Sequence, residues 1–93
     1  MTGMSQVTDN IEKRRFELDV DGQTVFANYR LDNNVMFINY VESPVALRGS
    51  GAAGKLMDGV MKIAQERSYK IVPICGYAVS WINRHKEYQS LLA

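Results

Sequence analysis

The chain has 93 residues, of which 46% are hydrophobic and 23% are charged, and its 11 basic and 10 acidic side chains leave a formal net charge of +1. This length allows one small domain with a single core and leaves no room for a second domain. Partners such as nucleic acid or an anionic membrane surface usually select a strongly basic face. We therefore expect neither nucleic acid nor a membrane as a partner.

The chain carries one cysteine, Cys75, so it cannot form an internal disulfide. It shows no signal-peptide-like segment and no apolar run long enough to cross a bilayer. We expect a cytoplasmic protein. Residues 1–12 mix polar types without a period and are predicted to be a flexible tail, and residues 13–93 are predicted to form the single domain.

Apolar residues alternate with polar ones from Arg15 to Val20, which predicts a strand with one buried face. Asp21-Gly22 is typical of a hairpin turn, and a second alternating run follows it. After the turn at Asp32-Asn33-Asn34, the dense apolar run Val35–Val41 predicts a strand buried on both faces. The first half is therefore predicted to be an antiparallel three-stranded meander.

The apolar period becomes helical between about Gly51 and Ser68. A short strand, Tyr69–Ile74, should follow in a parallel crossover, either at an edge of the sheet or in a distorted position because it contains a proline. A last helix, Tyr77–Arg84, should turn Ala78, Val79 and Ile82 inward. The predicted fold is α+β with an α/β-like second half.

A glycine-rich loop separates the meander from the first helix, and it is the most informative segment of the chain. Gly49-Ser50-Gly51-Ala52-Ala53-Gly54 fits a phosphate cradle, because glycines admit an anion to the main chain and the helix start supplies free N–H groups. The dinucleotide fingerprint G-x-G-x-x-G also matches, but no acidic residue ends the next strand. A Walker loop is excluded because Leu56, and not Ser or Thr, follows Lys55.

The remaining pattern, Arg48 followed by Gly49-Ser50-Gly51-Ala52-Ala53, resembles the acyl-coenzyme A pyrophosphate loop of the GNAT superfamily of N-acetyltransferases. The predicted order of elements is similar to the core of that fold. Val72-Pro73-Ile74-Cys75 and Arg84-His85-Lys86-Glu87-Tyr88 also resemble segments of a compact, YjdJ-type branch of the superfamily.

The resemblance implies a GNAT-type acyltransferase that uses acetyl-coenzyme A (acetyl-CoA) as cosubstrate and transfers the acetyl group to a primary amine, either a small amine or a protein lysine. The alternative is a non-catalytic module that binds or senses acyl-coenzyme A. In the family, the pantetheine arm pairs with main chain exposed between two splayed strands, which are Phe37–Glu42 and Ile71–Cys75 here. The implied coenzyme contacts are Asn39, Tyr40, Val41, Leu47, Arg48, Gly49, Ser50, Gly51, Ala52, Ala53, Gly54, Lys55, Cys75 and His85.

Two side chains are candidates for the chemistry. Cys75 either carries the acetyl group as a nucleophile, lines the thioester site, or is a buried small hydrophobe. Glu42 is either the general base that accepts the amine proton or an exposed charge at a loop edge. We favour direct attack of the amine with Cys75 lining the site. A lone histidine, His85, has no ligand partners at metal-binding spacing, so no metal site is predicted; it is either structural or in contact with the coenzyme.

Overall fold

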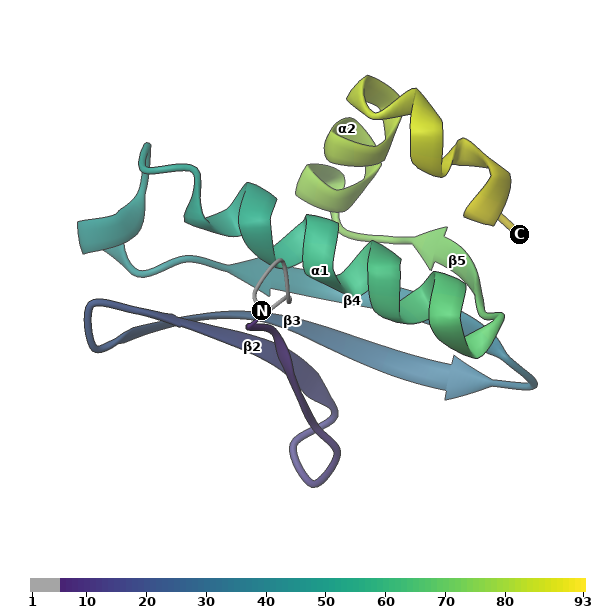
Figure 1. Ribbon diagram of the computed structural model, residues 1–93, viewed down its shortest axis with the longest axis horizontal. Helices are drawn as coiled ribbons and strands as arrows, with labels where there is room; N and C mark the ends of the chain where they lie inside the picture. The colour runs from purple at the N-terminus through teal and green to yellow at the C-terminus, as the bar shows by residue number, and fades with distance from the viewer. Residues whose placement is uncertain (1–5) are drawn as a thin grey trace.

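Strands fill the first half of the chain, as the alternation predicts. The computed structural model describes residues 6–93 and contains one five-stranded sheet in the order β1-β2-β3-β4-β5 (Figure 1). All neighbouring strands are antiparallel except β4 and β5, which are parallel. The predicted meander, crossover and edge position of the last strand are therefore confirmed. The strands are β1 (Thr8–Asn10), β2 (Arg15–Val20), β3 (Gln23–Asp32), β4 (Val35–Glu42) and β5 (Lys70–Pro73).

Strand β1 lies in the segment that was predicted to be a flexible tail, so that prediction is wrong for Thr8–Asn10. The strand is held by the side chain of Asp9, which accepts a hydrogen bond from the Tyr29 hydroxyl at 2.6 Å. The same carboxylate forms an ion pair with Arg67 at 2.8 Å. These partners lie far away in the sequence, which is why a polar three-residue strand left no local signal. Residues 1–5 of the predicted tail lie outside the described residues.

The first long helix, α1 (Ala52–Arg67), has the predicted bounds to within one residue. Gly51 and Ser68 flank it, both in the left-handed conformation, with φ angles of 87° and 60°. Such angles suit glycine before the helix and terminate it after Arg67. The remaining helices are the 3₁₀ helices η1 (Val45–Leu47) and η2 (Lys86–Leu91) and the α-helix α2 (Gly76–Arg84).

Both α-helices cover the same face of the sheet. Helix α1 contacts β2, β3 and β4, and α2 contacts β4 and β5. Their inward side chains share one core with alternate strand residues and with Tyr88 and Leu91 of η2, which dock the C-terminal segment. Val79 is exposed, so its predicted inward position is wrong. The largest fully buried side chains are Phe16, Val25, Met36, Ile38, Leu56, Met57, Val60, Met61, Ile71 and Ile82.

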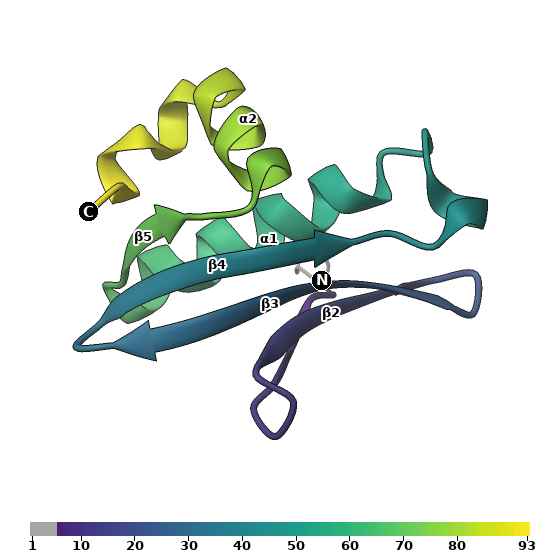
Figure 2. The same ribbon diagram turned by 180° about the vertical axis from the view of Figure 1, so that it is seen from behind.

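The other face of the sheet carries no helix among the described residues, and Figure 2 shows β3 and β4 in front of α1 with nothing covering them. The prediction that Val35–Val41 is buried on both faces is therefore wrong. Met36 and Ile38 are buried, whereas Tyr40 is half exposed. Arginine side chains take the place of a covering helix: the Arg30 guanidinium lies 4.1 Å from the centroid of the Phe37 ring.

Candidate functional site

The loop between β4 and α1 makes two left-handed bends. Gly49 and Gly51 have φ angles of 83° and 87°, a region that side chains disfavour, which explains the two glycines. Between them, the Ser50 hydroxyl donates to the Leu47 carbonyl at 2.5 Å and accepts from the Ala52 amide at 3.3 Å. Ser50 therefore has a structural part in holding the loop and the first helical residue together.

Four main-chain N–H groups of this loop and helix start donate to no acceptor within residues 6–93. They belong to Gly49, Gly51, Ala53 and Gly54. Unpaired amides that converge at glycine bends and a helix start favour an anion, because each N–H is a donor and the helix end carries partial positive charge. Ala52 differs from the prediction in one respect, since its amide already has an acceptor in Ser50.

A cavity of about 380 Å³ opens in front of these amides. It is lined by the end of β4, the loop and the first turn of α1, which follow one another in the sequence, and by one residue of α2. One wall is Tyr77 from α2, a residue that the sequence analysis missed. The lining residues are Tyr40, Val41, Glu42, Ser43, Leu47, Arg48, Gly49, Gly51, Ala52, Ala53, Gly54 and Tyr77.

Strands β4 and β5 diverge beside this cavity. Their ladder ends at Ile38 and Pro73, and the Ile38 carbonyl then accepts from both the Ile74 amide at 2.9 Å and the Cys75 amide at 3.2 Å. Beyond that carbonyl, residues 39–42 of β4 pair only with β3 in the described part of the chain. The main chain on their other side is free to pair with an extended ligand.

Tyr40 and Glu42 form a pair at the open end of β4. The Tyr40 hydroxyl donates a hydrogen bond to the Glu42 carboxylate, since residues two apart on a strand share a face. This bond is the main reason that the pKa of Tyr40 is raised, and the charges of Arg48, which lowers it, and Cys75, which raises it, also act on the hydroxyl. Tyr40 therefore contacts the predicted base Glu42 directly, and the charges of Arg48 and Cys75 act on its hydroxyl.

Cys75 stands at the start of α2 and does not line the cavity. Its carbonyl accepts the Val79 amide at 3.0 Å, and its half-buried side chain packs against the core. The contacts fit a packing residue close to the site. Asn39 is exposed at an irregularity in the β3–β4 register and likewise lines no cavity.

Two predicted coenzyme contacts, Lys55 and His85, lie in a second, larger cavity of about 730 Å³. The Nδ1–H of His85 donates to the Trp81 carbonyl at 2.7 Å, and the imidazole ring stacks on the Trp81 indole with centroids 3.7 Å apart. Gly51 and Gly54 line both cavities, so the two are adjacent. His85 therefore has the hydrogen bond and ring stacking of a structural residue, and it also lines a cavity, as a contact with the coenzyme would require.

Tyr77 gave no signal because it stands at the first turn of a helix whose apolar period marks other positions. Burial raises the pKa of its hydroxyl, so the phenol stays protonated at neutral pH. Among residues 6–93, no group of three histidine, cysteine or acidic side chains is placed to hold a metal ion. In the same range, no helix has the length and apolar character that a membrane span requires.

Comparison with known proteins agrees with this geometry. A family model described as GCN5-related N-acetyltransferase matches residues 15–91. The fold is similar to the NMR solution structure of a GCN5-like protein from Staphylococcus aureus, with a TM-score of 0.68 and 21% identity over 99% of this chain and 91% of the other. No curated protein matches the chain at a significant level. The family match covers most of the chain, and the chain therefore belongs to the GCN5-related N-acetyltransferases, with the fold of that superfamily.

Proposed function

We propose that this protein binds acetyl-CoA at the cavity beside the glycine loop and transfers the acetyl group to a primary amine. The observation that carries the proposal is the set of unpaired amides of Gly49, Gly51, Ala53 and Gly54, which line the cavity next to the free edge of β4. Pyrophosphate needs convergent donors, and a pantetheine arm needs an extended main chain to pair with. The cavity offers the hydrogen-bond donors and the extended main chain next to each other.

In this proposal, the pyrophosphate accepts hydrogen bonds from the four amides and a charged contact from Arg48. Arg48 lines the cavity, is exposed, and donates from Nε only to the Ser43 carbonyl at 3.3 Å, so its remaining N–H groups stay available. The pantetheine arm pairs with residues 39–42. The nucleotide end extends toward the second cavity, where Lys55 and His85 are the predicted contacts.

The reaction needs a proton acceptor for the amine and a proton donor for the leaving thiolate. The amine nitrogen attacks the thioester carbonyl carbon, a C–N bond forms and the C–S bond breaks. Glu42 accepts the amine proton, and the protonated phenol of Tyr77 donates to the coenzyme sulfur. Both side chains line the cavity. Cys75 lies outside the lining, which favours direct attack over transfer through an acetyl-cysteine.

The test combines binding with turnover. Titration of ¹⁵N-labelled protein with coenzyme A should shift the four loop amides most, and NAD at the same concentration should shift them far less, because the acidic ribose partner of a dinucleotide site is missing. Release of free coenzyme A from acetyl-CoA in the presence of amines then measures transfer. Binding without release for any amine would favour the non-catalytic acyl-coenzyme A module, and equal binding of NAD would contradict the assignment.

A further inference from the structure

The acetyl acceptor has to reach the thioester from the uncovered face of the sheet. Helices α1 and α2 close the other face, and residues of both helices stand around the cavity on that side. Tyr40 and Glu42 point to the uncovered face, because their partners across the β3–β4 ladder, Asn28 and Phe26, occupy the face opposite to buried Val25 and Ala27. An amine that approaches Glu42 therefore crosses this surface first.

Two rows of side chains run from Glu42 and Tyr40 across three strands. Glu42 stands opposite Phe26, which stands opposite Glu17, and Tyr40 stands opposite Asn28, which stands opposite Arg15. Strands lie about 4.8 Å apart, so each row extends roughly 10 Å away from the gap. We call these six residues the acceptor surface. Neither of the two cavities described above is lined by Phe26 or Asn28.

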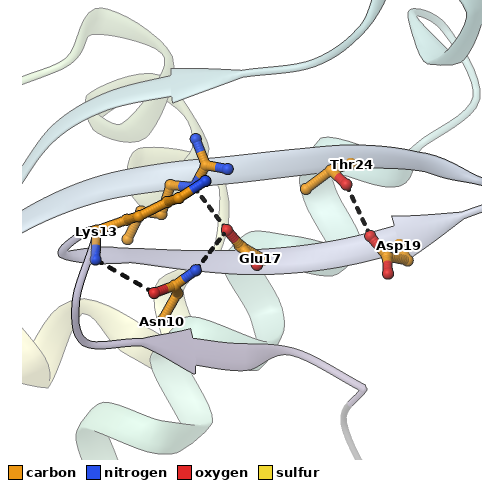
Figure 3. Close-up of polar contacts among 6 residues, drawn as sticks. Asn10, Lys13, Glu17, Asp19 and Thr24 are labelled. Atoms are coloured by element: carbon orange, nitrogen blue, oxygen red, sulfur yellow. Dashed lines mark hydrogen bonds and ion pairs between the residues drawn. The ribbon is translucent and has the colours of Figure 1, made fainter.

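The charges of this surface leave one carboxylate without a cation. Glu17 receives the Arg15 guanidinium at 2.6 Å and the Asn10 side-chain amide at 3.1 Å, so its pKa is lowered and its charge is matched. Figure 3 shows Asn10 of β1 and Glu17 of β2 joined in this way, with Thr24 of β3 bonded to Asp19 further along β2. Within residues 6–93, Glu42 forms no ion pair and its only polar partner is Tyr40.

The acceptor surface already holds one cation, the Arg15 guanidinium, over the ring of Phe26, which stands opposite Glu42. The Arg15 guanidinium lies 4.3 Å from the centroid of the Phe26 ring, in the geometry that aromatic rings offer to cations. The Asn28 side chain forms no hydrogen bond with the described residues, so its amide is free to pair with main chain laid across it. A carboxylate, the half-exposed Tyr40 ring, the partly buried Phe26 ring and a free amide suit a lysine carried by an extended polypeptide.

We infer that the acceptor is a lysine side chain within an extended polypeptide segment, which lies across the acceptor surface with its ammonium group at Glu42. This inference rests on the proposed acetyl transfer and narrows its acceptor. A small amine at Glu42 reaches no further than the neighbouring strand β3, so it forgoes Arg15 and Glu17 on β2 and cannot span both rows at once. The segment's flanking residues make the additional contacts, and these distinguish the polypeptide from a free amine.

The experiment compares two probes that share an ammonium group on an aliphatic stem: n-butylamine and the blocked peptide acetyl-Gly-Ser-Lys-Ser-Gly-amide. We expect kcat/KM for the peptide to exceed that for butylamine by about tenfold, equivalent to about 1.4 kcal/mol. Phe26→Ser should raise KM for the peptide about fivefold and leave kcat/KM for butylamine within about twofold. The matched control is Phe37→Ser, which also removes a ring beneath an arginine on the same face but far along β4 from Glu42. It should leave both probes unchanged.

Amide shifts in the unmodified protein give a readout that does not need turnover or a stable variant. With coenzyme A present and absent, the peptide should shift the amides of Phe26, Asn28 and Tyr40, and butylamine should shift only those near Glu42. Butylamine as the better acceptor, equal effects of the two phenylalanine variants, or peptide shifts confined to the helix-covered face would each overturn the inference. Failure of coenzyme A to shift the loop amides would instead overturn the proposed function.

Discussion

A Cβ atom added at Gly54 would lie 3.5 Å from Nε1 of Trp81, an ordinary van der Waals distance, so α1 and α2 meet closely at the edge of both cavities. Gly54→Ala should stabilise α1 by about 1 kcal/mol, because alanine is the better helix former. The methyl group would also narrow the space in front of the Gly54 amide. We expect a more stable protein that binds coenzyme A more weakly, as measured by urea denaturation and calorimetric titration.

Gly76→Ala is the control for Gly54→Ala, since a Cβ at Gly76 meets nothing within 4 Å and the residue lines neither cavity. Equal loss of coenzyme A binding in both variants would contradict the explanation.

Arg48 is the cationic residue in the lining of the cavity, and in the sequence it stands directly before Gly49, the first residue with an unpaired loop amide. Arg48→Ala should weaken coenzyme A binding by about 1 to 3 kcal/mol, the range for a hydrogen bond to a charged group. Because Arg48 is exposed and bonds only to the Ser43 carbonyl, the free energy of unfolding should change little. Lys13→Ala removes an exposed cation that lines neither cavity and should leave the affinity unaltered. An unchanged dissociation constant for Arg48→Ala would remove this residue from the site.

Cys75 tests the route of transfer. If the amine attacks the thioester directly, incubation of the protein with acetyl-CoA leaves no acetyl adduct in the intact mass spectrum, and Cys75→Ala retains most of the activity. The absence of Cys75 from the cavity lining is the physical reason for this expectation. A stable acetyl group on Cys75 that passes to an added amine, together with loss of turnover in Cys75→Ala, would show the covalent route instead.

Glu42 is the proposed acceptor of the amine proton. Glu42→Gln keeps the size of the side chain but removes the proton acceptor, so it should lower kcat about a hundredfold and leave coenzyme A affinity unchanged. Tyr40→Phe removes the hydrogen bond to the carboxylate but keeps the ring, so it should lower kcat by less than Glu42→Gln does. Steady-state rates and calorimetric titration of both variants measure these effects, and a Glu42→Gln variant with the rate of the original protein would exclude Glu42 as the base.

Tyr88 links the C-terminal segment to α1 through a hydrogen bond of 2.6 Å from its hydroxyl to Asp58. Burial, followed by the bond to Asp58, raises the pKa of Tyr88 from 10.0 to about 12. A pKa raised in the folded state adds stability that is present below the unfolded value, near pH 10, and is lost as the pH rises to about 12. Tyr88→Phe should cost about 1 kcal/mol at neutral pH and reduce the alkaline decline. Urea denaturation at pH 7 and pH 11 measures both effects, and an alkaline decline of undiminished size in Tyr88→Phe would assign it to other groups.

Local patterns in the sequence predict those parts of the fold that local energetics determine. The bounds of α1 follow from Gly51 and Ser68 at its ends, and the meander follows from alternation and turn residues. Strand β1 pairs with the nearby β2, but its three polar residues show no apolar alternation, and the partners of the Asp9 side chain, Tyr29 and Arg67, come from distant segments, so it could not be predicted. The density of apolar residues in Val35–Val41 was misleading, since Phe37 is covered by an arginine side chain and not by a helix.

In the candidate site, too, the features that local sequence determines could be predicted and those that depend on packing could not. The loop amides could be expected from the glycines and the helix start, because both features are local. The position of Tyr77 in the same cavity, and the separation of Lys55 and His85 into another, depend on how α2 packs beside α1. A pattern within one segment carries no information about that packing. The YjdJ-type branch stays a prediction, since the family match is to the broader description.

The unpaired half of β4 has a consequence for the behaviour of the free protein in solution. Residues 39–42 present main-chain donors and acceptors along an edge that β5 has left, and such edges recruit strands from other molecules. A coenzyme that pairs with this edge would also shield it. The bound ligand should then prevent association through this edge, so that concentrated samples without coenzyme A self-associate and those with coenzyme A stay monomeric.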